Sequence, residues 1–272
     1  MQDSAHTVLD DTKPVVMLHS SGSTANQWRD LVALLEPEWK TLTPDQWGCG
    51  DTGPWSGERP FTLSEEAAPV IRIIESGERP VHLVGHSYGG GVALNIARRY
   101  PDLIASLTLI EPTAFHLLMD GSDWDKTLYR EVLAVAKTVA VGLNTGHFRL
   151  SMERFVDYWN GEGTWEQLSP ERQAVLVGRV TKLPLDFRAL MEEDTGPDDF
   201  RSLDLPTLLI RGAESPIPAG RISEILNLVL PRSELVTIAG AGHMAPLTHG
   251  HAVNPLIHAH IRHHDQAPRI AA

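Results

Sequence analysis

Short, mostly apolar segments alternate with helical segments along most of this chain. The segments are Val15 to Leu18, Val81 to Val84, Ala105 to Ile110 and Thr207 to Ile210. Apolar residues at consecutive positions, rather than at every second one, are typical of strands buried on both faces. Because parallel strands need crossover connections, the alternation predicts an α/β protein with a mostly parallel central sheet and helices on both faces.

A long helical stretch interrupts this alternation. Between residues 113 and 200 no convincing strand occurs, and three segments have helical periodicity: 124–141, 151–159 and 169–181. Strand and helix alternate again after this stretch. The sequence therefore predicts a core made of residues 1–112 and 201–272, with an inserted all-helical cap at residues 113–200.

A glycine-rich turn joins one predicted strand to the helix that follows it. Residues 85–89 read GHSYG, which is a G-x-S-x-G pattern in a strand–turn–helix context. A serine on so sharp a turn has a strained backbone, and Gly85 and Gly89 lack the β-carbons that would collide with it. The pattern predicts that Ser87 is a nucleophile and that the amide of Tyr88 faces a developing oxyanion.

With this turn in place, the sequence resembles the α/β-hydrolase superfamily over nearly its whole length. The segment PVVMLHSSGSTANQW is similar to the oxyanion loop of that family. This resemblance implies an α/β-hydrolase fold, and it implies that Ser21 supplies a second oxyanion amide beside Tyr88. We interpret His19, in the same loop, as a structural hydrogen-bonding residue.

A histidine follows the last predicted strand. The segment AGAGHMAPL places His243 where the family carries its catalytic histidine. A serine hydroxyl is too weakly acidic to attack a substrate unaided, whereas an imidazole with an ordinary pKa near 6.5 takes up and returns a proton at neutral pH. We therefore expect His243 to be the general base.

Two glutamates compete for the third catalytic position. The commonest position in the family, three residues after Gly212, is Ser215, which cannot carry a charge. Glu214 lies one residue earlier. Glu111 ends a different strand, where some members of the superfamily, including several haloalkane dehalogenases, place the acid. Pro112 is expected to hold Glu111 in extended geometry. We favour Glu111 as the acid and keep Glu214 as the alternative.

These residues predict a serine hydrolase that cleaves a small or medium carboxylic ester through an acyl-enzyme intermediate. Two alternatives stay open: a carbon–carbon bond hydrolase of dienone or β-diketone substrates, and a hydrolase-fold receptor or ligand-binding protein with little turnover. Aromatic residues of the cap can line the substrate pocket, although at helical spacing such residues more often belong to the core: Trp124, Phe148, Phe155, Tyr158, Trp159, Trp165 and Phe187.

Composition restricts the partners and cofactors. Lys and Arg number 23 against 35 Asp and Glu, which gives a net charge of −12 and no basic field for a nucleic acid. The single cysteine, Cys49, excludes an intramolecular disulfide and a cysteine zinc site, and we interpret it as structural. The histidines between residues 249 and 264 are read as a cationic helix end. We therefore expect neither a metal nor an organic cofactor.

The sequence has neither a segment typical of a signal peptide nor an apolar run of the roughly 20 residues that span a bilayer. We accordingly expect a cytoplasmic protein without a membrane span. Only about a dozen residues precede the first predicted strand, so we expect the sheet to be truncated at that edge. An open sheet edge can recruit another chain, and a homodimer is one option.

Overall fold

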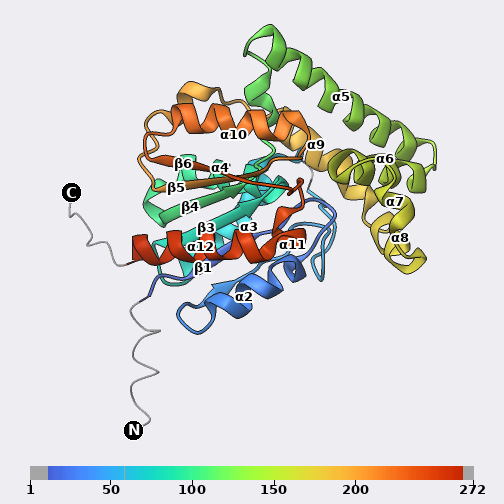
Figure 1. The fold of residues 1–272 in the computed structure, drawn as a ribbon. Helices are drawn as coiled ribbons and strands as arrows, with labels where there is room; N and C mark the ends of the chain where they lie inside the picture. The colour runs from blue at the N-terminus through green and yellow to red at the C-terminus, as the bar shows by residue number, and fades with distance from the viewer. Residues whose placement is uncertain (1–11, 58, 266–272) are drawn as a thin grey trace.

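The computed structural model describes residues 12–57 and 59–265, which form one six-stranded sheet in which every neighbouring pair is parallel (Figure 1). The strand order is β2-β1-β3-β4-β5-β6. The expectation of a truncated sheet edge depends on residues 1–11, which lie outside the described residues. The strands are β1 (Val15–Leu18), β2 (Thr41–Leu42), β3 (Val81–His86), β4 (Ile104–Ile110), β5 (Thr207–Gly212) and β6 (Ser233–Ile238).

The strand register aligns the carboxyl ends of the central strands. Leu18 at the end of β1 pairs with Gly85 of β3, and His86 of β3 pairs with Ile110 of β4. Ile110 pairs in turn with Ile210 of β5. The loops that follow these strands therefore leave the sheet at one common edge, as is usual for ligand sites of open parallel sheets.

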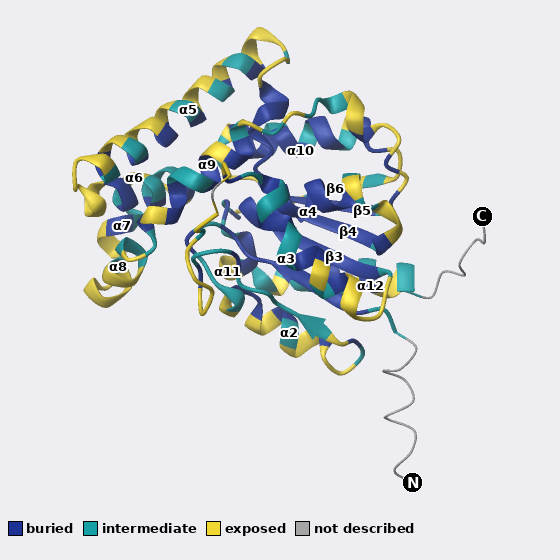
Figure 2. Cartoon of the chain, turned by 180° about the vertical axis from the view of Figure 1, so that it is seen from behind, coloured by how far each residue is buried: buried dark blue, intermediate teal, exposed yellow. Residues whose placement is uncertain are grey.

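Helices cover both faces of this sheet. One face packs against α2 (Arg29–Leu35) and α12 (Gly250–Asp265), and the other packs against α3 (Leu63–Ser76), α4 (Tyr88–Arg99) and α10 (Ile217–Val229). Figure 2 shows the central strands as a buried layer between helices whose outer faces are exposed. Successive strand residues point to opposite faces, which is why the strands are apolar at consecutive positions.

Local sequence signals set the helix boundaries. The Thr62 side chain accepts a hydrogen bond from the Glu65 amide and caps α3, which ends before Gly77. After β6 the chain forms two helices, α11 (Ala245–Thr248) and α12. The chain changes direction at His249, which is the C-cap of α11, so one continuous helix does not form.

In the described chain between β4 and β5, helices are the only regular secondary structure. The three helical segments predicted there correspond to α5 (Asp123–Asn144), α6 (Phe148–Asn160) and α8 (Pro170–Val177), and the sequence missed α7 (Thr164–Gln167) and α9 (Leu183–Met191). The sequence did not indicate α9 because Pro184 interrupts the helical pattern there, although proline is well tolerated in a first helical turn. The helices α5 to α9 lie beyond one end of the sheet (Figure 1). Short 3-10 helices are Ala25–Trp28, Pro101–Leu103, Phe115–Leu118, Val180–Lys182 and Pro197–Phe200.

No helix in the described part of the chain combines the length and the apolar character needed to cross a membrane.

Several histidines are buried inside the fold. Burial lowers the pKa of His19 and His82, of His86 to about 3, and of His116 and His260 to about 4. In the unfolded chain the same side chains take up protons near pH 6.5. Between pH 6.5 and pH 4 the unfolded state therefore binds more protons than the folded state, so the free energy of unfolding falls as the pH falls.

We expect the melting temperature to drop steadily between pH 7 and pH 5. Replacing His116, whose ring contacts the Leu190 carbonyl and the Thr195 hydroxyl, by Gln should flatten this dependence. The contribution of His116 over that interval is about 2 kcal/mol. His251→Gln, at an exposed position, should leave the pH dependence unchanged. Parallel curves for wild type and His116→Gln in thermal unfolding would contradict this account.

Candidate active site

The turn between β3 and α4 holds Ser87 in a strained conformation. The serine has φ 54° and ψ −118°, a backbone conformation that residues other than glycine rarely adopt. A β-carbon at Gly85 would lie 2.4 Å from the Gly89 carbonyl oxygen, and one at Gly89 would lie 2.3 Å from the Leu18 carbonyl oxygen. Both positions therefore require glycine, in agreement with the sequence interpretation.

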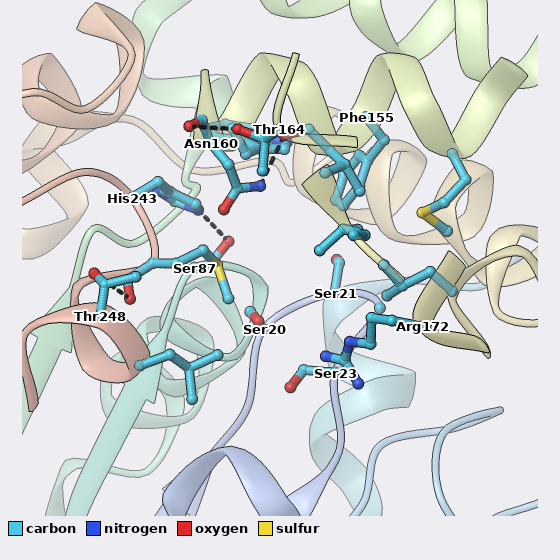
Figure 3. Close-up of a pocket in the computed structure, with 18 residues that line it drawn as sticks. Ser20, Ser21, Ser23, Ser87, Phe155, Asn160, Thr164, Arg172, His243 and Thr248 are labelled. Atoms are coloured by element: carbon cyan, nitrogen blue, oxygen red, sulfur yellow. Dashed lines mark hydrogen bonds between the residues drawn. The ribbon is translucent and has the colours of Figure 1, made fainter. Parts of the chain in front are cut away.

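Ser87, His243 and Glu111 form one chain of hydrogen bonds. His243 Nε2 lies 2.8 Å from Ser87 Oγ, and His243 Nδ1 lies 2.6 Å from Glu111 Oε2 (Figure 3 shows the first contact). The carboxylate can only accept, so Nδ1 carries the proton and Nε2 is free to accept from the serine hydroxyl. The three residues are 6%, 2% and 0% exposed. The structure thus brings together three residues that the sequence singled out separately.

The Glu111 carboxylate is held ionised by its surroundings. Its other oxygen accepts the Gly212 amide at 2.6 Å. Burial by itself would raise the pKa of Glu111, but the hydrogen bond from His243 and the electrostatic interaction with its ring, with smaller contributions from Ser215 and the Gly212 amide, leave that pKa below its ordinary value. Ser215 occupies the position where an acid is commonest in the family, and here it contributes to lowering the pKa of Glu111, which follows another strand.

The backbone of Glu111 corrects one expectation. Its φ is 44°, in the left-handed region, rather than the extended geometry that Pro112 was expected to impose. The Glu111 amide continues the sheet by donating to Ile210 at 2.9 Å, and two residues later the Thr113 amide donates to the Ser87 carbonyl at 3.2 Å. The chain must turn back over Ser87 within this distance, which outweighs the preference set by the proline.

The alternative acid, Glu214, lies outside this arrangement. Its side chain is exposed, and its amide donates to the Ala241 carbonyl at 2.9 Å. The geometry therefore favours Glu111 over Glu214 as the partner of His243.

The loop after β1 is ordered by His19. Its Nδ1 donates to the Ser20 carbonyl at 2.8 Å, and its Nε2 accepts the Gln46 amide at 3.3 Å. Both contacts fit a neutral ring, and burial lowers the pKa of His19. The loop places Ser21 beside Ser87 in the lining of a cavity. The amide of Tyr88, at the first position of α4, has no partner within its own helix and is available to a ligand.

The larger cavity at Ser87 has a volume of about 220 Å³ and a mainly apolar lining. Phe155 and Trp159 of α6 contribute to it, and Trp159 packs on the His243 ring with 4.3 Å between ring centroids. Among the cap aromatics considered from sequence, Trp165 is instead a core residue and Trp124 is exposed. In Figure 3, Arg172 lies on the side of the cavity away from His243. The Trp159 contact with the imidazole had no signal in the sequence.

Comparison with known proteins places these observations in a family. The sequence model of the alpha/beta hydrolase fold matches residues 13–250. The chain belongs to this family. The expected fold is thereby confirmed.

Curated relatives of this α/β-hydrolase include a pimeloyl-[acyl-carrier protein] methyl ester esterase from Neisseria meningitidis serogroup B, 27% identical over 252 residues that cover 89% of this chain and 90% of the relative. A putative carbamate hydrolase, RutD, from Pantoea ananatis is 22% identical over 252 residues, covering 91% and 87%. Among solved structures, MGS-M2, an alpha/beta hydrolase enzyme from a deep-sea metagenome library, superposes with a TM-score of 0.77 at 17% identity, covering 96% and 92%. This last likeness concerns the fold alone.

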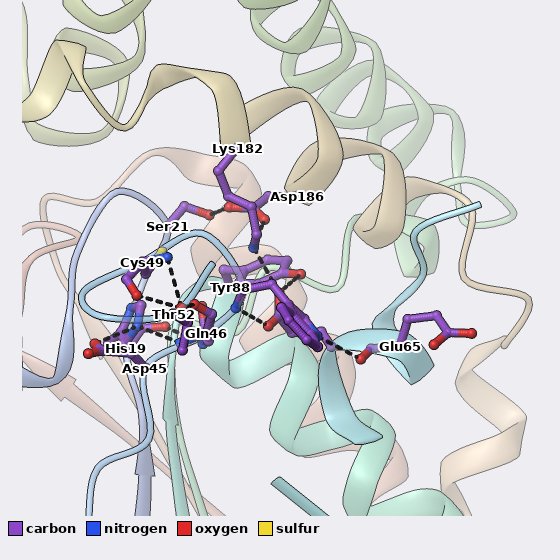
Figure 4. Close-up of polar contacts among 12 residues, drawn as sticks. His19, Ser21, Asp45, Gln46, Cys49, Thr52, Glu65, Tyr88, Lys182 and Asp186 are labelled. Carbon is purple, nitrogen blue, oxygen red and sulfur yellow. Dashed lines mark hydrogen bonds and ion pairs between the residues drawn. The ribbon is translucent and has the colours of Figure 1, made fainter. Parts of the chain in front are cut away.

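Glu66, Lys182 and Asp186 of this hydrolase form a buried charge cluster. Figure 4 shows Lys182 and Asp186 of this cluster near Ser21 and Tyr88. The Lys182 ammonium donates to Glu66 Oε2 at 2.7 Å and to Asp186 Oδ1 at 2.5 Å. Glu66 also accepts the Tyr88 hydroxyl at 2.9 Å, and Asp186 accepts the Ser21 hydroxyl at 2.7 Å. The cluster therefore links α9 with Ser21 and Tyr88, the two residues whose amides are expected to face the oxyanion.

The charges of the cluster depend on one another. Burial lowers the pKa of Lys182, but the charges of Asp186 and Glu66 outweigh this and raise it, so the lysine stays protonated. Burial raises the pKa of Asp186 to about 6 in spite of Lys182. Sequence reasoning missed the cluster, although Lys182 and Asp186 stand four residues apart in an otherwise apolar segment.

The residues that the structure describes offer no cluster of ligands for a metal ion. Across residues 12–57 and 59–265, no three His, Cys, Asp or Glu side chains lie where they could hold one metal ion together. Cys49 is buried, and burial raises its pKa to about 12.

Replacing Lys182 by Met should cost about 3–5 kcal/mol of unfolding free energy, because it leaves two buried carboxylates without their cation. Arg188→Met is the matched control, in α9, whose N-cap is Lys182. It removes an exposed ion pair with Glu192, whose N···O distance is 3.6 Å, and should cost at most about 1 kcal/mol. Urea unfolding measures both values, and equal losses would contradict the structural weight given to the cluster.

Proposed function

We propose that the protein is a serine hydrolase that cleaves a small or medium carboxylic ester through an acyl-enzyme intermediate. Ser87 is the nucleophile, His243 the general base and Glu111 the acid. The observation that carries the proposal is the unbroken hydrogen-bond chain from Ser87 through His243 to Glu111. Relatives named as an esterase and as a carbamate hydrolase support it.

Acylation follows from the direction of these hydrogen bonds. Ser87 Oγ forms a bond to the ester carbonyl carbon while its proton moves to His243 Nε2. The electron pair of the carbonyl moves to its oxygen, which the amides of Tyr88 and Ser21 receive. When the tetrahedral intermediate collapses, the bond to the alcohol oxygen breaks, and the alcohol leaves with the proton from Nε2.

Deacylation uses the same groups with water as the nucleophile. His243 takes a proton from water, whose oxygen attacks the acyl carbon, and Ser87 regains its proton when the carboxylic acid leaves. Glu111 holds the imidazole in the tautomer whose Nε2 is unprotonated and stabilises the imidazolium when it forms. The lowered pKa of Glu111 keeps it charged for this role.

We further propose that residues 113–200 act as a cap on a core of residues 1–112 and 201–272. Side chains from α6 and α8, including Phe155 and Leu176, line the cavity beside Ser87. Apolar walls of this kind select the substrate mainly by shape and apolar contact.

Ser87→Ala should abolish the covalent step. A fluorophosphonate should add one adduct to the wild-type chain and none to the variant, as measured by mass spectrometry of the intact protein. Hydrolysis of an aryl acetate should fall by about 10⁶-fold, because the variant has no hydroxyl to activate. An adduct on the variant would refute the nucleophile. Labelling without turnover of any ester would favour the receptor alternative, and turnover of a dienone alone would favour carbon–carbon hydrolysis.

Glu111→Gln should lower kcat by about 10⁴-fold, the loss typical when the triad acid of a serine protease becomes an amide. The amide can donate to Nδ1 and so favours the wrong tautomer of His243. Glu214→Gln is the matched control, because that side chain is exposed and should change kcat little. Both variants should keep their circular dichroism spectra. A folded Glu214→Gln protein with the larger loss would overturn the assignment.

A further inference from the structure

Two cavities meet at Ser87. The larger one, of about 220 Å³, includes His243 and Met244 in its lining. The smaller one, of about 10 Å³, has Thr113, Phe115, Leu183, Asp186, Phe187 and Leu190 in its lining, all from the segment between β4 and β5. The Asp186 carboxylate there is already bound to Lys182 and to the Ser21 hydroxyl. Ser21, Ser87, Phe155 and Trp159 line both cavities, so an ester carbonyl bound at Ser87 can reach into each of them.

The position of the base distinguishes the two sides of the ester. The alcohol oxygen must take its proton from His243 Nε2, so the alcohol lies on the histidine side of the reacting carbon. His243 lines the larger cavity, and it is not among the residues described as lining the smaller one. The oxyanion points at the loop amides and the alcohol occupies the larger cavity. The acyl substituent therefore extends into the smaller cavity.

The smaller cavity limits the acyl group by size. A volume of about 10 Å³ is close to the minimum that holds one water molecule, so the cavity leaves no room for an acyl substituent much larger than a methyl group. Its walls are rigid, because Phe115 stacks against both Phe187 and Trp159 with interplanar angles of 21°. Leu183 and Leu190, fully or almost fully buried, close it. A longer acyl chain would have to displace packed aromatic and leucine side chains.

We propose that the protein is an acetyl esterase in which this acyl chamber, lined by Thr113, Phe115, Leu183, Asp186, Phe187 and Leu190, admits an acetyl group while the larger cavity takes an apolar alcohol. This inference rests on the proposed function and adds its substrate class. It sets the protein apart from an enzyme that accepts a long acyl chain on a small alcohol, which would need the large cavity on the acyl side.

The first experiment varies the two sides of the ester separately in the wild-type protein. For p-nitrophenyl esters, kcat/KM should fall at least about tenfold from acetate to butyrate and again to octanoate. For acetate esters, kcat/KM should instead rise from methyl to butyl to phenylethyl alcohols. The opposite pair of trends would overturn the proposal by reversing the two sides, and a flat acyl series would overturn the size limit.

The second experiment changes the wall of the chamber. Phe187→Leu enlarges the chamber and should raise the butyrate-to-acetate ratio of kcat/KM about tenfold. If Phe187→Leu does not fold, Leu190→Ala tests the same wall. Leu176→Ala is the matched control, because Leu176 lines the larger cavity and belongs to another helix. It should leave the acyl ratio unchanged and alter the alcohol series. A shift of the acyl ratio in Leu176→Ala alone would overturn the assignment of the chamber.

Failure of this inference can be separated from failure of the proposed function. If the fluorophosphonate labels Ser87 and long acyl esters are the better substrates, only the acyl chamber is wrong. If Ser87 is not labelled and Ser87→Ala keeps its activity, the proposed function fails and the chamber assignment fails with it.

Discussion

The parallel register of β1, β3, β4 and β5 is the constraint on which the site depends. Because the strands end together, the loops after them converge at one edge, where Ser87 follows β3 and Glu111 follows β4. The amide of Glu111 still belongs to the ladder through Ile210, so its carboxylate is fixed relative to the neighbouring strand. The loop after β6 carries His243, whose ring contacts both residues. Rigid strands hold this geometry more accurately than free loops would.

Strain at this edge is concentrated at two residues, Ser87 and Glu111, which are the non-glycine residues with positive φ in the described chain. Each such conformation costs on the order of 1–3 kcal/mol and persists only when the surroundings fix it. The Ser87 amide bonds to Ile110 at 2.9 Å and the Glu111 amide to Ile210 at 2.9 Å, so the sheet itself supplies that support. The same strain keeps the hydroxyl and the carboxylate pointed at one imidazole.

The charge cluster of Glu66, Lys182 and Asp186 joins the inserted helices to the core. A buried ion pair gives little net stability on its own, because the cost of removing charges from water offsets their attraction. Here the cluster has additional hydrogen bonds to the Ser21 and Tyr88 hydroxyls, the two residues whose amides are proposed to receive the oxyanion. Its value to the protein therefore lies in fixing the position of α9 relative to α3, Ser21 and Tyr88.

The sequence alone determined the features that depend on neighbouring residues. The apolar strands, the glycine-flanked Ser87 turn and the position of His243 are local patterns, and backbone sterics and burial give them one structural meaning. Tertiary structure decided what depends on distant residues. Glu111 lies 132 positions from His243, and Glu66 lies 116 from Lys182, so no local pattern could separate Glu111 from Glu214 or reveal the cluster. The acyl chamber, too, exists only where side chains from separate helices pack together, because its volume is set by that packing.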